Sequence, residues 1–181
     1  MSIEKLEKIL EPPIAPVDSP VADGWSDAER KLGKLPDDYK RFIELYGTGS
    51  IDGFVWIFNP FTSNKNLNLL DQIQIKISAL SDLSETFGEA LPFPLFPKPN
   101  GLLPFGVTDN GDVLFWQVAN NPDDWKVIIN AAREPKWKKY DVDMTDLLAG
   151  LLSRQIICEV FPGDFPSNRP VFYPNVFTSA S

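Results

Sequence analysis

The chain has 181 residues, of which 43% are hydrophobic and 12% aromatic, so it is long enough for one domain with a substantial core and too apolar for wholesale disorder. Its 25 acidic and 17 basic residues give a formal net charge of −8, which disfavours direct binding of nucleic-acid phosphates. It contains no histidine and a single cysteine, which excludes Ser-His-Asp and Cys-His catalysis, internal disulfides and almost every common zinc site.

The expected cellular compartment follows from the absence of membrane-spanning and secretory patterns in the sequence. No run reaches the roughly 18 apolar residues of a membrane helix, and residues 1–10 mix charged and apolar residues instead of showing a secretory pattern. Cys158 sits in an apolar stretch, which indicates a buried structural thiol. We expect a cytoplasmic protein that makes no membrane contact. Its acidic surface favours a basic protein partner or serves solubility alone.

The N-terminal 24 residues are predicted to form a helix and a proline-rich arm. Residues 2–10 place their apolar side chains on one helical side, and four prolines within residues 11–20 enforce an extended path. A first core helix is expected from Ser26 to about Leu32. Ser26 would cap it, with Glu29 as the reciprocal member of a capping box.

A second helix is predicted from Asp37 to Tyr46. Asp37 and Asp38 follow Pro36, where carboxylates favour the positive end of the helix dipole. Glycines at 47 and 49 end the helix, and residues 51–58 are expected to form one buried strand. The helix should bury one apolar face, formed by Tyr39, Phe42, Ile43 and Tyr46.

The next segment, residues 67–88, is predicted to be a helix because it is long and lacks breakers, although Ile73, Ile75 and Ile77 alternate as in a strand. Its apolar face should comprise Leu70, Ile73, Ile77, Leu80 and Phe87. Residues 91–103 hold too many prolines for a helix. They form either a rigid loop that packs its aromatic side chains on the core or a polyproline-like surface for a partner.

An antiparallel meander is predicted for residues 102–142. Asn110-Gly111 indicates a tight hairpin between strands 102–108 and 113–119. Residues 113–116 are apolar on both faces, which predicts a central strand. Strands 125–131 and 137–142 follow. Their basic residues and tryptophans are typical of single-stranded nucleic-acid binding, but nearby acids cancel the charge, so a lysine-protected edge strand is the better interpretation.

A helix over residues 143–154 and an aromatic, proline-rich tail complete the chain. The tail, which includes Phe177, is expected to wrap the domain or cap an oligomer interface. The predicted fold class is α+β, a single domain with a largely antiparallel central sheet flanked by helices. The expected division is residues 1–24 (arm), 25–160 (domain) and 161–181 (tail).

Residues 25–150 carry, in order, a set of features that resembles the SUKH superfamily, also called SMI1/KNR4-like. The features are Trp25, the acidic helix with Glu29, Leu35-Pro36-Asp37-Asp38-Tyr39-Lys40-Arg41-Phe42, Tyr46-Gly47, Asn59-Pro60 and Gly111-Asp112 before an aromatic strand. The resemblance implies helices around an antiparallel sheet. It also implies a role, since many bacterial members look like immunity proteins that neutralise a toxin, often a nuclease, and fungal members regulate cell-wall signalling.

The acidic residues suggest no catalytic or metal site. Asp109 to Asp112 begin like a calcium loop but lack its later ligands, and Asp123-Asp124 are typical of a solvated turn. An enzyme would need two carboxyl groups about 5 to 10 Å apart in a cleft. We therefore predict no catalytic residues, no bound metal and no cofactor.

The functional hypothesis is stoichiometric binding of a protein partner, a basic toxin domain, by an acidic face with aromatic anchors. A core role is favoured for Trp56. The alternatives are an intracellular regulatory scaffold and a carboxylate enzyme, and the sequence leaves the oligomeric state open. The candidate partner-binding residues are Trp25, Glu29, Asp37, Asp38, Asp52, Trp56, Asp109 and Asp112.

Overall fold

Apolar side chains on both faces of the middle strands set the architecture. In the computed structural model, which describes residues 2–176, Leu114 and Trp116 join the main core, whereas Phe115 between them packs with Leu102 and Ile128 on the other side. The prediction that residues 113–116 form a strand covered on both faces is therefore confirmed. Met1 and residues 177–181, including Phe177 of the tail, lie outside the described residues.

Within residues 2–176, seven strands form one sheet in the order β6-β5-β4-β3-β2-β1-β7, with every neighbouring pair antiparallel. The strands are β1 (Gly49–Ile51), β2 (Val55–Ile57), β3 (Leu102–Thr108), β4 (Val113–Gln117), β5 (Lys126–Asn130), β6 (Trp137–Tyr140) and β7 (Phe172–Pro174). The helices are α1 (Ser2–Ile9), α2 (Gly24–Leu32), α3 (Asp37–Tyr46), α4 (Leu69–Phe87), the short 3-10 helix η1 (Pro122–Asp124) and α5 (Met144–Leu152). The predicted α+β fold is confirmed.

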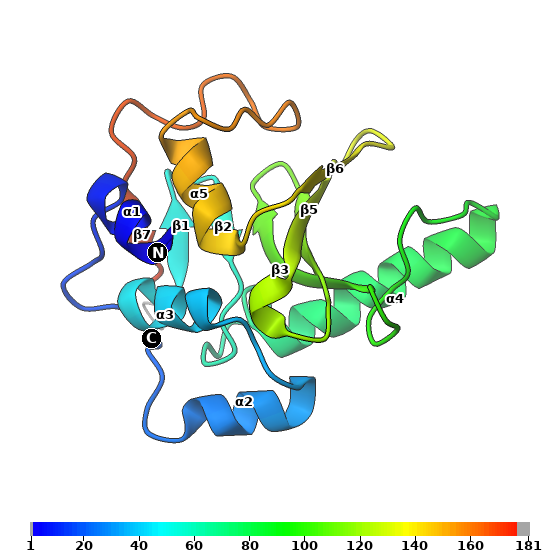
Figure 1. Cartoon of the computed structure of the whole chain (residues 1–181), viewed down its shortest axis with the longest axis horizontal. Helices are drawn as coiled ribbons and strands as arrows, with labels where there is room; N and C mark the ends of the chain where they lie inside the picture. Colours follow the sequence, from blue (N-terminus) through cyan, green and yellow to red (C-terminus); the bar gives the residue numbers. More distant parts are fainter. Residues whose placement is uncertain (1, 177–181) are drawn as a thin grey trace, which may run out of the picture.

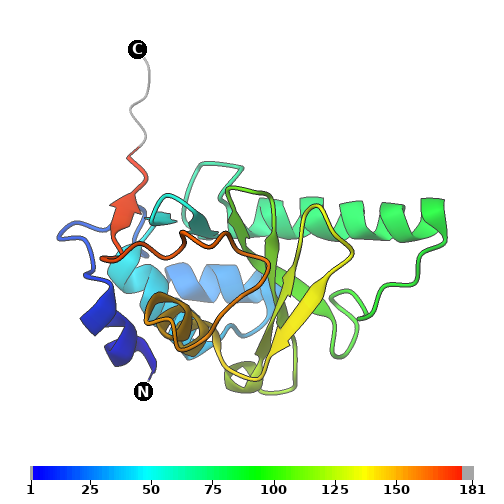
Figure 2. The ribbon, with the colours of Figure 1, turned by 90° about the horizontal axis from the view of Figure 1, so that it is seen from above.

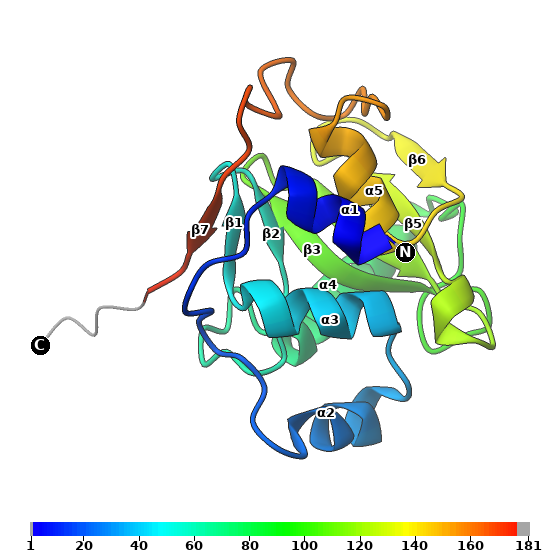
Figure 3. The ribbon, with the colours of Figure 1, turned by 60° about the vertical axis from the view of Figure 1, so that its left-hand side comes forward.

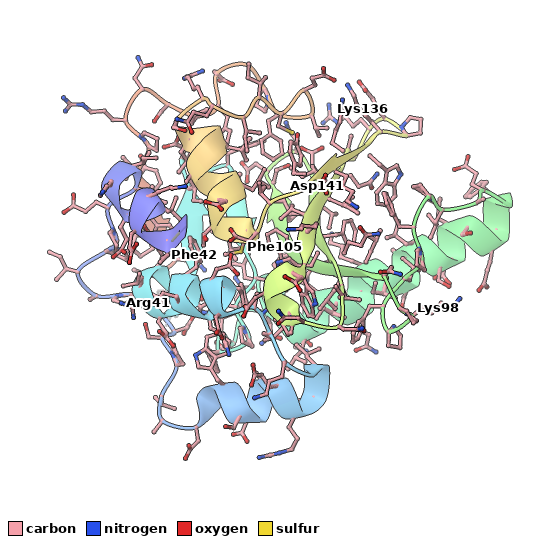
Figure 4. The ribbon with its side chains drawn as sticks, viewed as in Figure 1. Arg41, Phe42, Lys98, Phe105, Lys136 and Asp141 are labelled. Carbon is pink, nitrogen blue, oxygen red and sulfur yellow. The ribbon has the colours of Figure 1, made fainter. Side chains whose placement is uncertain are left out.

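The helices cover the two faces of the sheet unequally. Figure 3 shows α1, α3 and α5 in front of the sheet and α4 behind it. Phe42 of α3 and Phe105 of β3 are fully buried in the main core (Figure 4). On the other side, Leu80 of α4, with Phe93 and Leu95 of the proline-rich loop, packs over the smaller cluster. These loop residues therefore pack on the sheet, as the rigid-loop interpretation predicted.

Residues 51–58 correct the prediction of a single strand. They form a hairpin in which Ile51 pairs with Val55 across Asp52, Gly53 and Phe54. Asp52 and Gly53 have φ angles of 53° and 67°, and the N–H of Phe54 donates to the carbonyl of Ile51 at 2.9 Å, so these two residues are the left-handed centre of a tight turn. The apolar composition of the segment suggested one buried strand, but the Asp-Gly pair was the stronger local signal.

The start of α2 corrects the predicted capping box. The helix begins at Gly24, before Ser26, and its N-cap Asp23 makes no side-chain capping hydrogen bond. The carboxylate of Glu29 instead accepts a hydrogen bond from the N–H of Leu35 at 3.1 Å. It therefore fixes the turn that follows α2.

Both ends of the described chain belong to the core. Leu6 and Leu10 at the N-terminus are fully buried, and the hydroxyl of Tyr46 donates to the carbonyl of Leu10 at 2.6 Å. Near the C-terminus, β7 pairs with β1. The division into arm, domain and tail stays a prediction.

Helix α4 extends beyond the body of the molecule (Figure 1, Figure 2). It has 19 residues and is therefore about 28 Å long, and Asn68 caps its N-terminus through Leu70 and Asp71. The prediction that Phe87 belongs to the buried face of this helix is wrong, because Phe87 lies past the sheet and is 69% exposed. In the described part of the chain, no helix has the length and hydropathy needed to cross a membrane.

Candidate partner-binding surface

Five carboxylates from three separate segments gather where α3, η1 and α5 begin. We call this the acidic surface. Three of its members, Asp37, Asp123 and Asp124, are exposed, and two are partly buried. The acidic surface consists of Asp37, Asp38, Asp123, Asp124 and Asp143.

Hydrogen bonds between elements hold the acidic surface together. The carboxylate of Asp123 in η1 accepts from the N–H of Asp37 at 3.0 Å, so it satisfies a free donor at the start of α3. Asp38 of α3 likewise accepts from the N–H of Thr145 at 3.0 Å, in the first turn of α5. The first turns of α3 and α5 thus each donate an N–H to an acid from another element, and the positive ends of these helix dipoles stabilise the carboxylates.

Asp38 is the member of this surface whose pKa is shifted by its surroundings. Burial raises the pKa of Asp38 to about 6, and the nearby charge of Asp143 adds to the shift, whereas the N–H groups of Thr145 and Tyr39 oppose it. Asp143 caps its own helix by accepting from the N–H of Asp146 at 2.7 Å. Shifted carboxyl pKa values of this kind cluster at functional sites.

Trp25 and Glu29 on α2 lie beside this surface but serve the fold. The side chain of Glu29 is 10% exposed and pairs with Lys34 at 3.0 Å and Lys40 at 3.2 Å. Burial opposes its charge, yet the N–H of Leu35 and these two ammonium groups hold the pKa of Glu29 below its ordinary value. Trp25 packs edge-on against Phe61.

Lys40 is shared between α2 and the acidic surface. It pairs with Asp37 at 2.9 Å as well as with Glu29, and burial is outweighed by these carboxylates, which raise the pKa of Lys40. The Asp37 side chain remains 77% exposed despite this pair. It therefore stays accessible to a further cation.

The other four candidates lie at the opposite end of β4. Asp109 and Asp112 precede this strand and η1 follows it, so roughly 15 Å separates the two groups. Trp56 is partly buried and donates from its indole N–H to Asp109 at 3.2 Å. The structure therefore does not bring Asp52, Trp56, Asp109 and Asp112 to the acidic surface.

Two acids of this second group bind the protein's own backbone. Asp112 is 4% exposed and accepts from the Thr108 hydroxyl at 2.7 Å and from the N–H of Ala132 at 3.0 Å. Asp52 accepts from the N–H groups of Ser167 and Val171 at 2.8 and 2.9 Å. A partner-binding role for them stays a prediction that these contacts do not favour.

Sequence reasoning missed Asp123, Asp124 and Asp143 as members of this surface. The first two were interpreted as a solvated turn, and they do form an exposed 3-10 turn. No local pattern links residue 123 to residue 37. Only Asp143 carried a signal that could have found it, since it begins the predicted helix 143–154 just as Asp37 and Asp38 begin theirs, and acids collect where helix N-termini converge.

Within residues 2–176, no group of three or more His, Cys, Asp or Glu side chains is placed to hold a metal ion. Cys158 is buried beside an apolar cavity of about 300 Å³. What the acidic surface offers chemically is ion pairing and hydrogen bonding to a cationic partner.

Comparison with known families finds one family whose model matches the region from α2 to the start of α5. The SUKH family model described as SMI1-KNR4 cell-wall matches residues 22–148, more than half of the chain. The chain belongs to the SUKH superfamily. SUKH proteins are generally non-catalytic, and the superfamily includes toxin immunity proteins. No curated protein and no solved structure showed significant similarity to the chain.

The SUKH match includes the whole acidic surface but not the ends of the described chain. Asp37, Asp38, Asp123, Asp124 and Asp143 all lie within residues 22–148. Helix α1 precedes the matched region, and β7 follows it. In this SUKH protein, the matched region is therefore completed by elements on both sides of it.

Proposed function

We propose that this SUKH protein is a cytoplasmic immunity protein that neutralises a basic toxin domain by stoichiometric binding. The observation that carries the proposal is the gathering of carboxylates from three distant segments on one surface. Superfamily membership and the net charge of −8 support it. The protein would act by covering the toxin's substrate cleft.

The acidic surface suits this role physically. Exposed carboxylates attract a basic partner over several ångströms and orient it before contact, which raises the association rate. The contacts that hold Asp37, Asp38 and Asp123 in place exist without a partner. Such a preorganised surface loses little side-chain freedom on binding.

A titration tests stoichiometric neutralisation. Basic toxin domains from genes neighbouring this one would be purified, and their activity measured as the protein is added in increasing molar ratio. We expect a linear loss that ends at one protein per toxin, with a complex of that composition by light scattering. Continued toxin activity at excess protein, or loss of activity at a few per cent of the toxin's concentration, would contradict the proposal.

A regulatory scaffold is the second candidate, and the cell-wall description of the matching family favours it. A scaffold would bind several endogenous partners and would leave toxin activity unchanged. The same titration therefore separates the two functions.

A further inference from the structure

The projecting part of α4 carries apolar side chains that the fold leaves uncovered. Ile75, Leu83 and Phe87 are 52%, 44% and 69% exposed, and Ala79 between them is also exposed. Their spacing of four residues lines them up along the helix. We call this row, Ile75, Ala79, Leu83 and Phe87, the α4 ridge. Exposed apolar surface concentrated on one element marks interaction sites.

A cavity adjoins the α4 ridge. It measures about 510 Å³ and lies between the end of α4, residues 89–92 and the turn between β5 and β6. Leu83 lines it together with Leu80, Leu91 and Trp137. Because Leu83 belongs to both, the ridge is continuous with the apolar part of the cavity wall, and the cavity is large enough to receive an anchoring side chain.

Acidic side chains border this apolar surface. Asp82 and Glu85 stand on α4, and Glu89 and Glu134 line the cavity, all four exposed. Arg133 in the cavity wall and the partly buried Lys76 on α4 are the basic residues near this surface. The four acids outnumber them, so the border is negative on balance, which favours an occupant that carries Lys or Arg around apolar anchors.

We propose that the α4 ridge and its cavity bind a basic amphipathic segment of a protein partner, with its apolar face on the ridge. A second copy of this chain fits less well. An antiparallel, two-fold pairing of two α4 helices sets the flank with Asp71, Asp82 and Glu85 against the same flank of the other copy. Like charges would then face each other across the contact.

This surface is separate from the acidic surface, because α4 covers the sheet face opposite α3 and α5 (Figure 3). It does not depend on the proposed neutralising function. A partner bound here leaves Asp37, Asp123 and Asp124 accessible. The protein can therefore hold two partners at once.

The test selects ligands for this surface without assuming a partner. A display library of random 20-residue peptides would be panned on the full chain and counter-selected on Leu83→Ser/Phe87→Ser, a variant changed only at exposed positions. We expect enriched peptides with net positive charge and apolar residues at helical spacing. Fluorescence anisotropy should show their affinity falling at least about tenfold in that variant.

Two further variants separate charge from packing. Asp82→Asn/Glu85→Gln/Glu89→Gln, which changes only exposed side chains, should weaken binding of the selected peptides by roughly threefold or more. Asp37→Asn/Asp123→Asn/Asp124→Asn should bind them like the wild type. The proposal is overturned if no peptide survives counter-selection, or if the enriched peptides are neutral or acidic. Light scattering that shows a dimer converted to a monomer by Leu83→Ser/Phe87→Ser would also overturn it, since a second copy would then be the occupant.

Discussion

At the scale of single residues, the acidic surface combines stabilising contacts with an electrostatic cost. Asp123 and Asp38 each satisfy a helix N-terminus. Asp38 also holds a charge in a partly buried position next to Asp143. Binding sites commonly keep charged groups that lower the stability of the fold, because replacing these groups would stabilise the protein but weaken binding.

Asp38→Asn should stabilise the protein at neutral pH. The folded-state pKa of Asp38 is about 6, raised from an ordinary value of 3.8, so the folded protein binds a proton that the unfolded chain has released. The free energy of unfolding therefore falls as pH rises from about 4 to about 6 and stays lower above that range. The substituted amide keeps an acceptor for Thr145 without the charge, so we expect a gain of about 1–3 kcal/mol at pH 7.5.

Urea unfolding at pH 4, 5, 6 and 7.5 measures this effect. The gain should shrink towards pH 4, where the wild-type carboxyl is protonated in the folded state. Asp37→Asn, at the exposed neighbouring position, is the control and should leave this pH profile unchanged. A variant at position 38 that is less stable than the wild type at pH 7.5 would show that the buried charge carries no net cost.

Gly47→Ala should destabilise the protein strongly. Gly47 ends α3 with φ at 68°, and a Cβ there would lie 2.1 Å from the carbonyl oxygen of Val17. We expect a loss of at least about 2 kcal/mol in the free energy of unfolding, because both the backbone at residue 47 and the segment around Val17 must shift. Gly163→Ala, where no atom lies within 4 Å, should change stability little. Equal effects of the two substitutions would contradict this account of Gly47.

The residue scale also shows what local sequence can and cannot predict. The acids at the start of α3, its buried aromatic face and its glycine end follow from local propensity. The hydrogen-bond partner of Glu29 could not be predicted in this way. Its carboxylate reaches Leu35 instead of Ser26 because α2 begins at Gly24, earlier than the capping-box pattern indicated.

At the scale of elements, the main core depends on segments that flank the SUKH match. Leu6 of α1 and Leu10 just after this helix pack into the core, and Phe172 of β7 contacts Phe42 and Tyr46 of α3. The amphipathic pattern predicted α1, whereas the pairing of β7 with β1 joins Phe172–Pro174 to Gly49–Ile51, two segments far apart in the sequence. Pairings of that separation leave no periodicity in the sequence.

Leu6→Ala tests whether α1 is part of the stable fold. Leu6 is fully buried, so we expect a loss of about 2–4 kcal/mol in the free energy of unfolding. Leu83→Ala on the α4 ridge, where the side chain is 44% exposed, is the matched leucine control and should cost much less. If both variants unfold at the same urea concentration as the wild type, α1 does not dock as described.

The hairpin of β1 and β2 shows how two local signals can compete. A run of apolar residues predicted one strand, and the Asp-Gly pair inside it is typical of a turn. The turn prevails because Asp52 also anchors the loop before β7 through Ser167 and Val171. A contact between residues 115 positions apart thus reinforces the local preference.

At the scale of the whole molecule, charge and topology together define the candidate site. Composition gives the net charge of −8, but only the fold brings residues 37–38, 123–124 and 143 together. The same fold separates them from Asp109 and Asp112, which the sequence grouped with Asp37 and Asp38. The fold class was predictable because the meander and its helices can each be recognised from local sequence. The site was not predictable, since it is formed by the N-terminal ends of helices that are far apart in the sequence.

The central claim is that the acidic surface binds a basic protein partner. The most direct measurement is the association rate and affinity of the cognate toxin domain for Asp37→Asn/Asp123→Asn/Asp124→Asn at low salt. The matched control removes the same charge elsewhere with Glu11→Gln/Asp23→Asn/Asp164→Asn, all at exposed positions. We predict an association rate at least about tenfold lower for the first variant and within about twofold of wild type for the control. Equal binding by the two variants would contradict the claim.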